Sequence, residues 1–203
     1  MNFLHRFGLS DETVRFIEPY CIKEKGKLSF PFFSLEQSLS CSSEVLFINK
    51  TIKNADNGLL TIEQDAYAIK TQMIIFDNIL NLLAYYNDSN RFLFENTVFV
   101  VVSIKPTFSD IQFLKNKFIY VKNYSLVFNQ DLAGYCKAIL ITSYLSNIEN
   151  ISIHLNGDQL IVNLNDLTKN FLLDKFTFKR FKSLFKIPIK IVSTKPKGIF
   201  FNH

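Results

Sequence analysis

The feature that most constrains the fold is an alternation, over residues 71 to 174, of short apolar segments with segments of helical periodicity. Residues 98–102, "VFVVV", are apolar without a break, which is typical of a strand buried on both faces of a parallel sheet. The segments "DNILNLLAYYN" and "QDLAGYCKAILITSYLSN" instead have apolar residues three and four apart, as amphipathic helices do. This alternation predicts an α/β domain, with a mostly parallel sheet flanked by helices.

The pattern also divides the chain. In the first part, Ser10 is placed to cap a helix that Pro19 ends, and strands are expected in "GKLSFPFFSL" and "SEVLFINK". In the second part we expect strands in "YAIKTQMIIF", "YSLVF" and "NISIHL", a helix in "TFSDIQFLKNK", capped by Thr107 or Ser109, and a last helix beginning in "NDLTKNFLL". We therefore predict a small α+β subdomain over residues 1–70, an α/β domain over 71–174, and a basic C-terminal segment over 175–203.

Polar residues follow three of the predicted strands. They are Asp77 and Asn78, then Asn129 and Asp131, and then Asn163, Asn165 and Asp166. Ligands of α/β folds sit beyond the carboxyl ends of the strands, so these positions are candidates for a binding site. The simpler alternative is that they are turn residues and helix caps, because Asn and Asp favour strand-to-helix corners.

Composition excludes several classes of protein. No apolar run approaches the roughly 20 residues of a membrane span, and the start of the chain has no leader pattern. Three cysteines (Cys21, Cys41 and Cys136) without a CxxC spacing argue against a disulfide framework or a zinc site, and favour a cytoplasmic location. The three histidines are far apart, and no Gly-rich phosphate loop is present.

The C-terminal segment concentrates the positive charge. Between Lys175 and Lys197 there are eight basic residues and no acidic one. Its first part predicts an amphipathic helix ending at Pro188, with a Phe stripe (Phe178, Phe181, Phe185) and a basic stripe. Either the Phe side packs on the sheet while the lysines face water, or the basic side contacts nucleic-acid phosphates or a membrane surface. The basic residues proposed for nucleic-acid contact are Lys175, Lys179, Arg180, Lys182 and Lys186. The final "KIVSTKPKGIFFNH" can add an edge strand, and its "IFF" is a candidate for docking a protein partner or for core packing.

The order of these motifs resembles the Toprim domain, in the primase-like version found on bacterial mobile elements. "GLSDETVRF" followed by "KLSFPFF" is similar to the small subdomain that precedes Toprim in primases. "MIIFDNILNLLAYY" lies where the family has a strand ending in Glu, "SLVFNQDLAG" where it has Asp-x-Asp before Ala-Gly, and "VNLNDL" resembles a third acidic block. The resemblance implies a general acid/base at Asp77 and Mg²⁺ ligands at Asn129, Asp131 and Asn163.

The departures from that pattern weaken the implied chemistry. Asp77 is one methylene shorter than the family's Glu, and Asn129 and Asn163 carry amides where the family has carboxylates. Mg²⁺ gives up its water reluctantly and needs several charged oxygen ligands, so a degenerate site that holds no cofactor is expected.

The leading hypothesis is a non-catalytic, Toprim-like accessory protein that acts with DNA or RNA in replication or mobilisation of a genetic element. An active Mg²⁺-dependent primase or nuclease, using Asp77 and Asp131, is the alternative. A protein-interaction module with a vestigial site is the third hypothesis.

Overall fold

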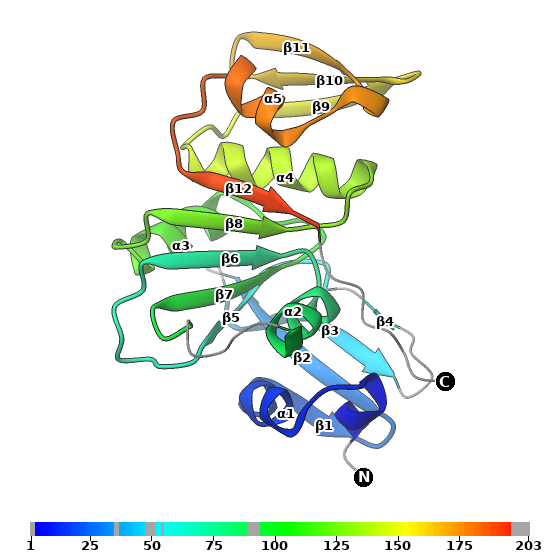
Figure 1. Ribbon diagram of the computed structural model, residues 1–203, viewed down its shortest axis with the longest axis vertical. Helices are drawn as coiled ribbons and strands as arrows, with labels where there is room; N and C mark the ends of the chain where they lie inside the picture. The colour runs from blue at the N-terminus through cyan, green and yellow to red at the C-terminus, as the bar shows by residue number, and fades with distance from the viewer. Residues whose placement is uncertain (1–2, 35–36, 48–51, 54, 89–93, 196–203) are drawn as a thin grey trace.

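The computed structural model describes residues 3–34, 37–47, 52–53, 55–88 and 94–195. Its main sheet has nine strands in the order β12-β8-β6-β7-β5-β2-β3-β4, and β1 pairs with β2 (Figure 1). These strands are β1 (Ile22–Glu24), β2 (Lys27–Ser34), β3 (Gln37–Phe47), β4 (Ile52–Lys53), β5 (Leu59–Glu63), β6 (Gln72–Phe76), β7 (Thr97–Val102), β8 (Asn123–Val127) and β12 (Ile191–Thr194). Strands from both sides of residue 70 thus share one sheet, and the division into subdomains at that residue stays a prediction.

Four neighbouring strands, β12, β8, β6 and β7, are parallel. The helices that connect or cover them are α1 (Asp11–Ile17), α2 (Ile79–Asp88), α3 (Phe108–Lys117) and α4 (Leu132–Leu145). Every residue of β7 is buried, as its unbroken apolar run predicts. The α/β fold class, with parallel strands flanked by helices, is confirmed.

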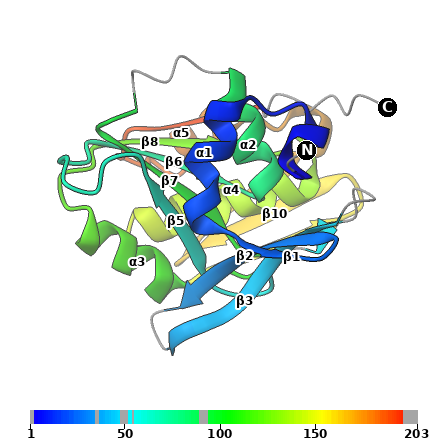
Figure 2. The same cartoon turned by 90° about the horizontal axis from the view of Figure 1, so that it is seen from below.

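The two faces of the main sheet build two separate cores. Phe99 and Val101 of β7 pack with α1 and α2, which lie side by side in Figure 2. Val98, Val100 and Val102 point to the opposite face and pack with α3 and α4. Successive side chains of a strand alternate between faces, so a single apolar strand anchors helices on both sides.

The helix starts follow the sequence closely. The hydroxyl of Ser10 accepts from the N–H of Thr13, which caps α1 as expected. At α3 the cap is Thr107: its hydroxyl accepts from the N–H of Asp110, and the Asp110 carboxylate accepts from the N–H of Thr107. This reciprocal capping box fixes the turn that leads from β7 into α3.

Two predictions for residues 150–173 are wrong. The strand at 151–155 does not join the parallel sheet, because β9 (Ile151–Asn156), β10 (Gln159–Leu164) and β11 (Leu167–Leu172) form a separate antiparallel sheet. The segment beginning at Asn165 is therefore a strand and not a helix. Gly157 at φ 59° and Asn165 at φ 51° supply the left-handed residues that tight hairpins require, and they reverse the chain twice.

The C-terminal segment contains a 3-10 turn (Leu173–Lys175), α5 (Phe178–Leu184) and β12. The helix is shorter than expected: it ends before Pro188, and Lys175 precedes it. Phe181 and Phe185 are buried against the second sheet, and α4 lies between that sheet and the main one (Figure 1). Packing on a sheet is confirmed for Phe181 and Phe185 of the Phe stripe, whereas Phe178 is half-buried, and the edge strand, β12, is confirmed as well.

Some of the residues named in the sequence analysis lie outside the part of the chain that the structure describes. Cys21 and Cys136 are free thiols, whereas the side chain of Cys41 lies outside the described part, and so does the "IFF" of residues 199–201. Among the described residues, no helix combines the length and apolar character that crossing a bilayer requires.

Candidate site at the carboxyl ends of β6 and β8

Asp77 follows the last residue of β6 and is held by its neighbours. Its Oδ1 accepts from the side-chain amides of Asn78, at 3.0 Å, and Asn81, at 2.5 Å. Asn78 in turn accepts from the N–H of Asn81 at 2.9 Å, so it caps the first turn of α2, as the simpler interpretation of this corner predicts. The Asp77 carboxylate is therefore oriented by the beginning of the helix that follows it.

Asn129 and Asp131 follow β8, the parallel neighbour of β6. The N–H of Asn129 points to Oδ2 of Asp77 at 3.4 Å, which joins the two strand ends. Asp131 is the N-cap of α4, and its Oδ1 accepts from the N–H of Gly134 at 2.8 Å. The capping prediction for Asp131 is thus confirmed, and capping leaves its second carboxylate oxygen for another partner.

Gly134 is required by this corner. A Cβ at this position would lie 1.8 Å from the carbonyl oxygen of Asn129, far inside van der Waals contact. Only glycine lets the first turn of α4 pack this closely on the end of β8. The Gly of "NQDLAG" therefore fixes how α4 leaves the strand end.

These residues line one hollow, which we call the strand-end pocket, with a volume of about 500 Å³. Asp77, Asn129 and Asp131 lie in its wall, together with Lys137 of α4. Two of the three predicted strand ends thus lie at one pocket, as expected for the carboxyl ends of neighbouring parallel strands.

Lys137 is the cation of the strand-end pocket. Its Nζ donates to the backbone carbonyl of Asp77 at 3.5 Å. Burial lowers the pKa of Lys137, and the nearby carboxyl groups, Asp77 more than Glu44, oppose that fall. The amino group of Lys137 is therefore held at the end of β6, next to the backbone of the residue that the sequence singled out.

Glu44 of β3 is a buried acid behind the pocket. It is 1% exposed, and both its oxygens accept from the N–H of Ile79, at 3.0 and 3.1 Å. Burial raises the pKa of Glu44 to about 8, the Ile79 hydrogen bond opposes that rise, and the charge of Asp77 adds to it. At neutral pH this carboxyl is mainly protonated, so it adds little negative charge to the site.

Sequence reasoning missed both Glu44 and Lys137, although each left a signal. Glu44 precedes the buried Leu46 by two residues, and residues two apart on a strand share a face, so a charged side chain was directed at the core. Lys137 is the one charged residue in the helix "LAGYCKAILITSYL".

The third predicted strand end is placed elsewhere. Asn163 lies within β10, where its amide donates to the Ser152 hydroxyl at 2.7 Å and its oxygen accepts from Thr168 at 2.6 Å. Asn163, Asn165 and Asp166 are not among the described residues that line the strand-end pocket. In the described part of the chain, no group of three or more His, Cys, Asp or Glu side chains is arranged to hold a metal ion.

No protein-family model and no curated protein matches the chain. Solved structures give partial similarity. The DnaG catalytic core is 15% identical over 77% of this chain and 61% of its own, with a TM-score of 0.47. The DnaG primase catalytic domain bound to ssDNA is 12% identical over 91% and 68%, with a TM-score of 0.44. The primase fragment of the bacteriophage T7 primase-helicase protein is 13% identical over 72% and 60%, with a TM-score of 0.45. The chain thus spans about three fifths of the length of the DnaG catalytic core.

Proposed function

We propose that this chain is a non-catalytic, Toprim-like protein that binds nucleic acid and assists replication or mobilisation of a genetic element. The observation that carries the proposal is the charge balance of the strand-end pocket. Asp77 and Asp131 share this pocket with the basic side chain of Lys137, and an amide stands at Asn129. One net negative charge remains once the protonated Glu44 is discounted.

Such a pocket suits a divalent cation poorly. Mg²⁺ needs several charged oxygens in near-octahedral geometry, and a pocket with two carboxylates and one lysine offers it few ligands and a weak net attraction. In phosphoryl transfer the ion neutralises charge on the reacting phosphate, so a site without it lacks the main catalytic element. The pocket keeps the shape of an α/β ligand site with reduced metal chemistry.

The nucleic-acid contact is assigned to the basic face of the C-terminal segment. Phe181 and Phe185 pack inward, and Lys179, Arg180 and Lys186 are exposed on the outside of the same segment. Exposed cations close together on one short segment displace counterions from a phosphate backbone, which favours binding without reading the base sequence.

Nucleic-acid binding is tested by fluorescence anisotropy with a labelled single-stranded oligothymidine over a salt titration. For a single strand each phosphate contact adds about 0.7 to the slope of log affinity against log salt, so removing three contacts lowers the slope by about 2. We expect this loss for the variant Lys179→Ala/Arg180→Ala/Lys186→Ala.

A matched control removes the same charge from exposed positions elsewhere, Lys25→Ala/Lys105→Ala/Lys122→Ala, and should keep the wild-type slope. Equal losses in both triple variants would refute the assignment to this face. Absence of binding at low salt would refute the nucleic-acid proposal and favour the protein-interaction hypothesis.

A second candidate, an active Mg²⁺-dependent enzyme, is favoured by one observation: Asp77 and Asp131 line the same pocket. Thermal unfolding with and without millimolar Mg²⁺ or Mn²⁺ separates the two candidates, because a bound ion stabilises the folded state by mass action. We expect no shift in Tm. A shift that disappears in the variant Asp77→Asn/Asp131→Asn would favour the enzyme instead.

A further inference from the structure

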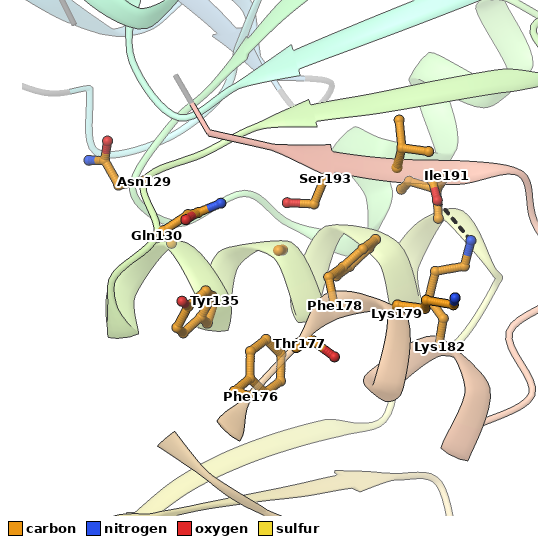
Figure 3. A pocket seen from close by; sticks show the side chains of 13 residues that line it. Asn129, Gln130, Tyr135, Phe176, Thr177, Phe178, Lys179, Lys182, Ile191 and Ser193 are labelled. Atoms are coloured by element: carbon orange, nitrogen blue, oxygen red, sulfur yellow. Dashed lines mark hydrogen bonds between the residues drawn. The ribbon is translucent and has the colours of Figure 1, made fainter. Parts of the chain in front are cut away.

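A second hollow, which we call the aromatic pocket, opens between α4, α5 and β12 (Figure 3). Its volume is about 530 Å³, within the range of small-molecule sites. It meets the strand-end pocket at Asn129 and Gly134, which line both. The sequence singled out some of its lining residues, such as Asn129, Lys179 and Lys182, but did not predict the pocket, because α4 is far along the chain from α5 and β12.

One wall of the aromatic pocket is made of rings. Tyr135 of α4 and Phe176 lie with ring centroids 4.7 Å apart at a tilt of 41°, and Phe178 at the start of α5 lies between α4 and β12 (Figure 3). Phe178 is only partly buried, so its ring offers an apolar face to the pocket. A wall of this kind suits a flat, apolar group such as a nucleobase, which stacks or packs edge-on against aromatic side chains.

Two lysines of α5 make the pocket basic next to Phe178. Lys179 is exposed, and Lys182 is half-buried, with its Nζ donating to the carbonyl of Ile191 at 2.8 Å (Figure 3). Burial lowers the pKa of Lys182. Among the described residues that line the aromatic pocket there is no Asp or Glu, so no carboxylate competes with an incoming anion.

Polar groups that can hydrogen-bond a ligand lie between the rings and the lysines. The Ser193 hydroxyl on β12 and the Gln130 side chain are directed at the pocket in Figure 3, and Asn129 lies at its rim. Ser193 and Gln130 are exposed, so both are accessible to a ligand. Rings, amides, a hydroxyl and two ammonium groups thus surround one volume.

We propose that the aromatic pocket binds a nucleoside monophosphate without a metal ion. The base packs against Tyr135 and Phe178, and the phosphate is bound by Lys179 and Lys182. A phosphate dianion requires cations, and here the protein supplies them directly. This site goes beyond the proposed function: it shares Lys179 with the basic face, but neither Asp77 nor Asp131 lines it, and a mononucleotide needs no nucleic-acid strand.

The test is isothermal titration calorimetry of the full chain with AMP, GMP, CMP and UMP, in EDTA and then in Mg²⁺. We expect at least one nucleotide to bind, and the same affinity with and without the metal. The nucleoside of the nucleotide that binds, and inorganic phosphate alone, should each bind at least about tenfold more weakly than that nucleotide, because each keeps only part of its contacts.

Variants assign the binding to the aromatic pocket. Lys179→Ala should weaken binding about tenfold or more, as expected for the loss of a charge-assisted hydrogen bond. Ser193→Glu should abolish it by placing a carboxylate beside the phosphate, whereas Ser193→Gln, of equal size and without charge, should weaken it far less. Arg180→Ala, one residue along α5 and outside the pocket, should leave nucleotide affinity unchanged.

Three results would overturn the proposal: no binding at millimolar nucleotide, equal affinity in wild type and Lys179→Ala, or binding that requires Mg²⁺ and is lost in Asp77→Asn/Asp131→Asn. A failure of nucleotide binding in the aromatic pocket can be distinguished from a failure of nucleic-acid binding by the basic face. Arg180→Ala weakens binding of a nucleic-acid strand if the basic face is the contact, and it leaves mononucleotide binding intact in either case.

Discussion

Glu44 offers the sharpest test of the structure, through the variant Glu44→Gln. The carboxyl is 1% exposed, and its pKa is raised to about 8 chiefly by burial. An unfolded Glu titrates near its ordinary pKa of 4.5. Between these two values the folded chain holds a proton that the unfolded chain has released, so stability falls as pH rises through this window.

The magnitude follows from linkage. Each pH unit well inside the window lowers the free energy of unfolding by about 1.4 kcal/mol. Because an unfolded Glu is still partly protonated at pH 5, the change from pH 5 to pH 7 is about 2.5 kcal/mol. Glutamine stays neutral at every pH, and its side-chain oxygen can still accept from the N–H of Ile79. The advantage of Glu44→Gln over wild type should therefore grow by about 2.5 kcal/mol over these two pH units.

Urea unfolding of both proteins at several pH values measures this difference. Groups that titrate in the same way in both proteins do not contribute to it, because their effects on the free energy of unfolding cancel in the subtraction. Glu95→Gln is the control, because Glu95 is exposed and its replacement should leave the pH dependence of wild type unchanged. If wild type and Glu44→Gln lose stability in parallel as pH rises, Glu44 is not a buried neutral acid, and the charge balance proposed for the strand-end pocket fails with it.

Three further predictions concern the site and the core. Gly134→Ala forces a Cβ against the Asn129 carbonyl and should cost about 1–3 kcal/mol of stability in urea unfolding, whereas an unchanged midpoint would refute the close contact. Asn129→Asp combined with Lys137→Gln adds one carboxylate and removes the ammonium, so Mg²⁺ should now raise Tm, by an amount equivalent to about 2.7 kcal/mol at 100 times the Kd. Phe181→Ala should cost about 3–5 kcal/mol because the ring is fully buried, whereas exposed Lys179→Ala should stay within about 0.5 kcal/mol; similar losses would contradict the inward-facing Phe stripe.

Sequence reasoning succeeded where local pattern and sheet geometry agree. The apolar run of β7, the caps at Ser10 and Thr107, and the meeting of Asp77 with Asn129 all follow from rules that act over a few residues or at the end of a parallel strand. The segment Leu167–Leu172 is a strand where the sequence predicts a helix. Few of its residues are buried, so its sequence lacks the clear alternation of apolar and polar residues that indicates a strand. The hairpin partner, β10, decides its conformation.

The parts of the site that were not predictable depend on contacts between distant residues. Glu44 and Ile79 meet because β3 and α2 share one core, and no spacing rule connects residues so far apart. Lys137 was visible as an isolated charge, but its role depends on how α4 leaves β8 after Gly134. The aromatic pocket likewise needs β12 to return beside β8.

That return of β12 has a consequence for how the protein is made. The antiparallel sheet β9–β11 closes through short hairpins and can form as soon as its residues leave the ribosome. By contrast, β8 waits for Ile191–Thr194 to supply its outer neighbour. Until then the growing chain exposes β8 as an open sheet edge, where another chain can pair. Synthesis of the residues that follow β8 is thus the interval in which this fold is most open to aggregation.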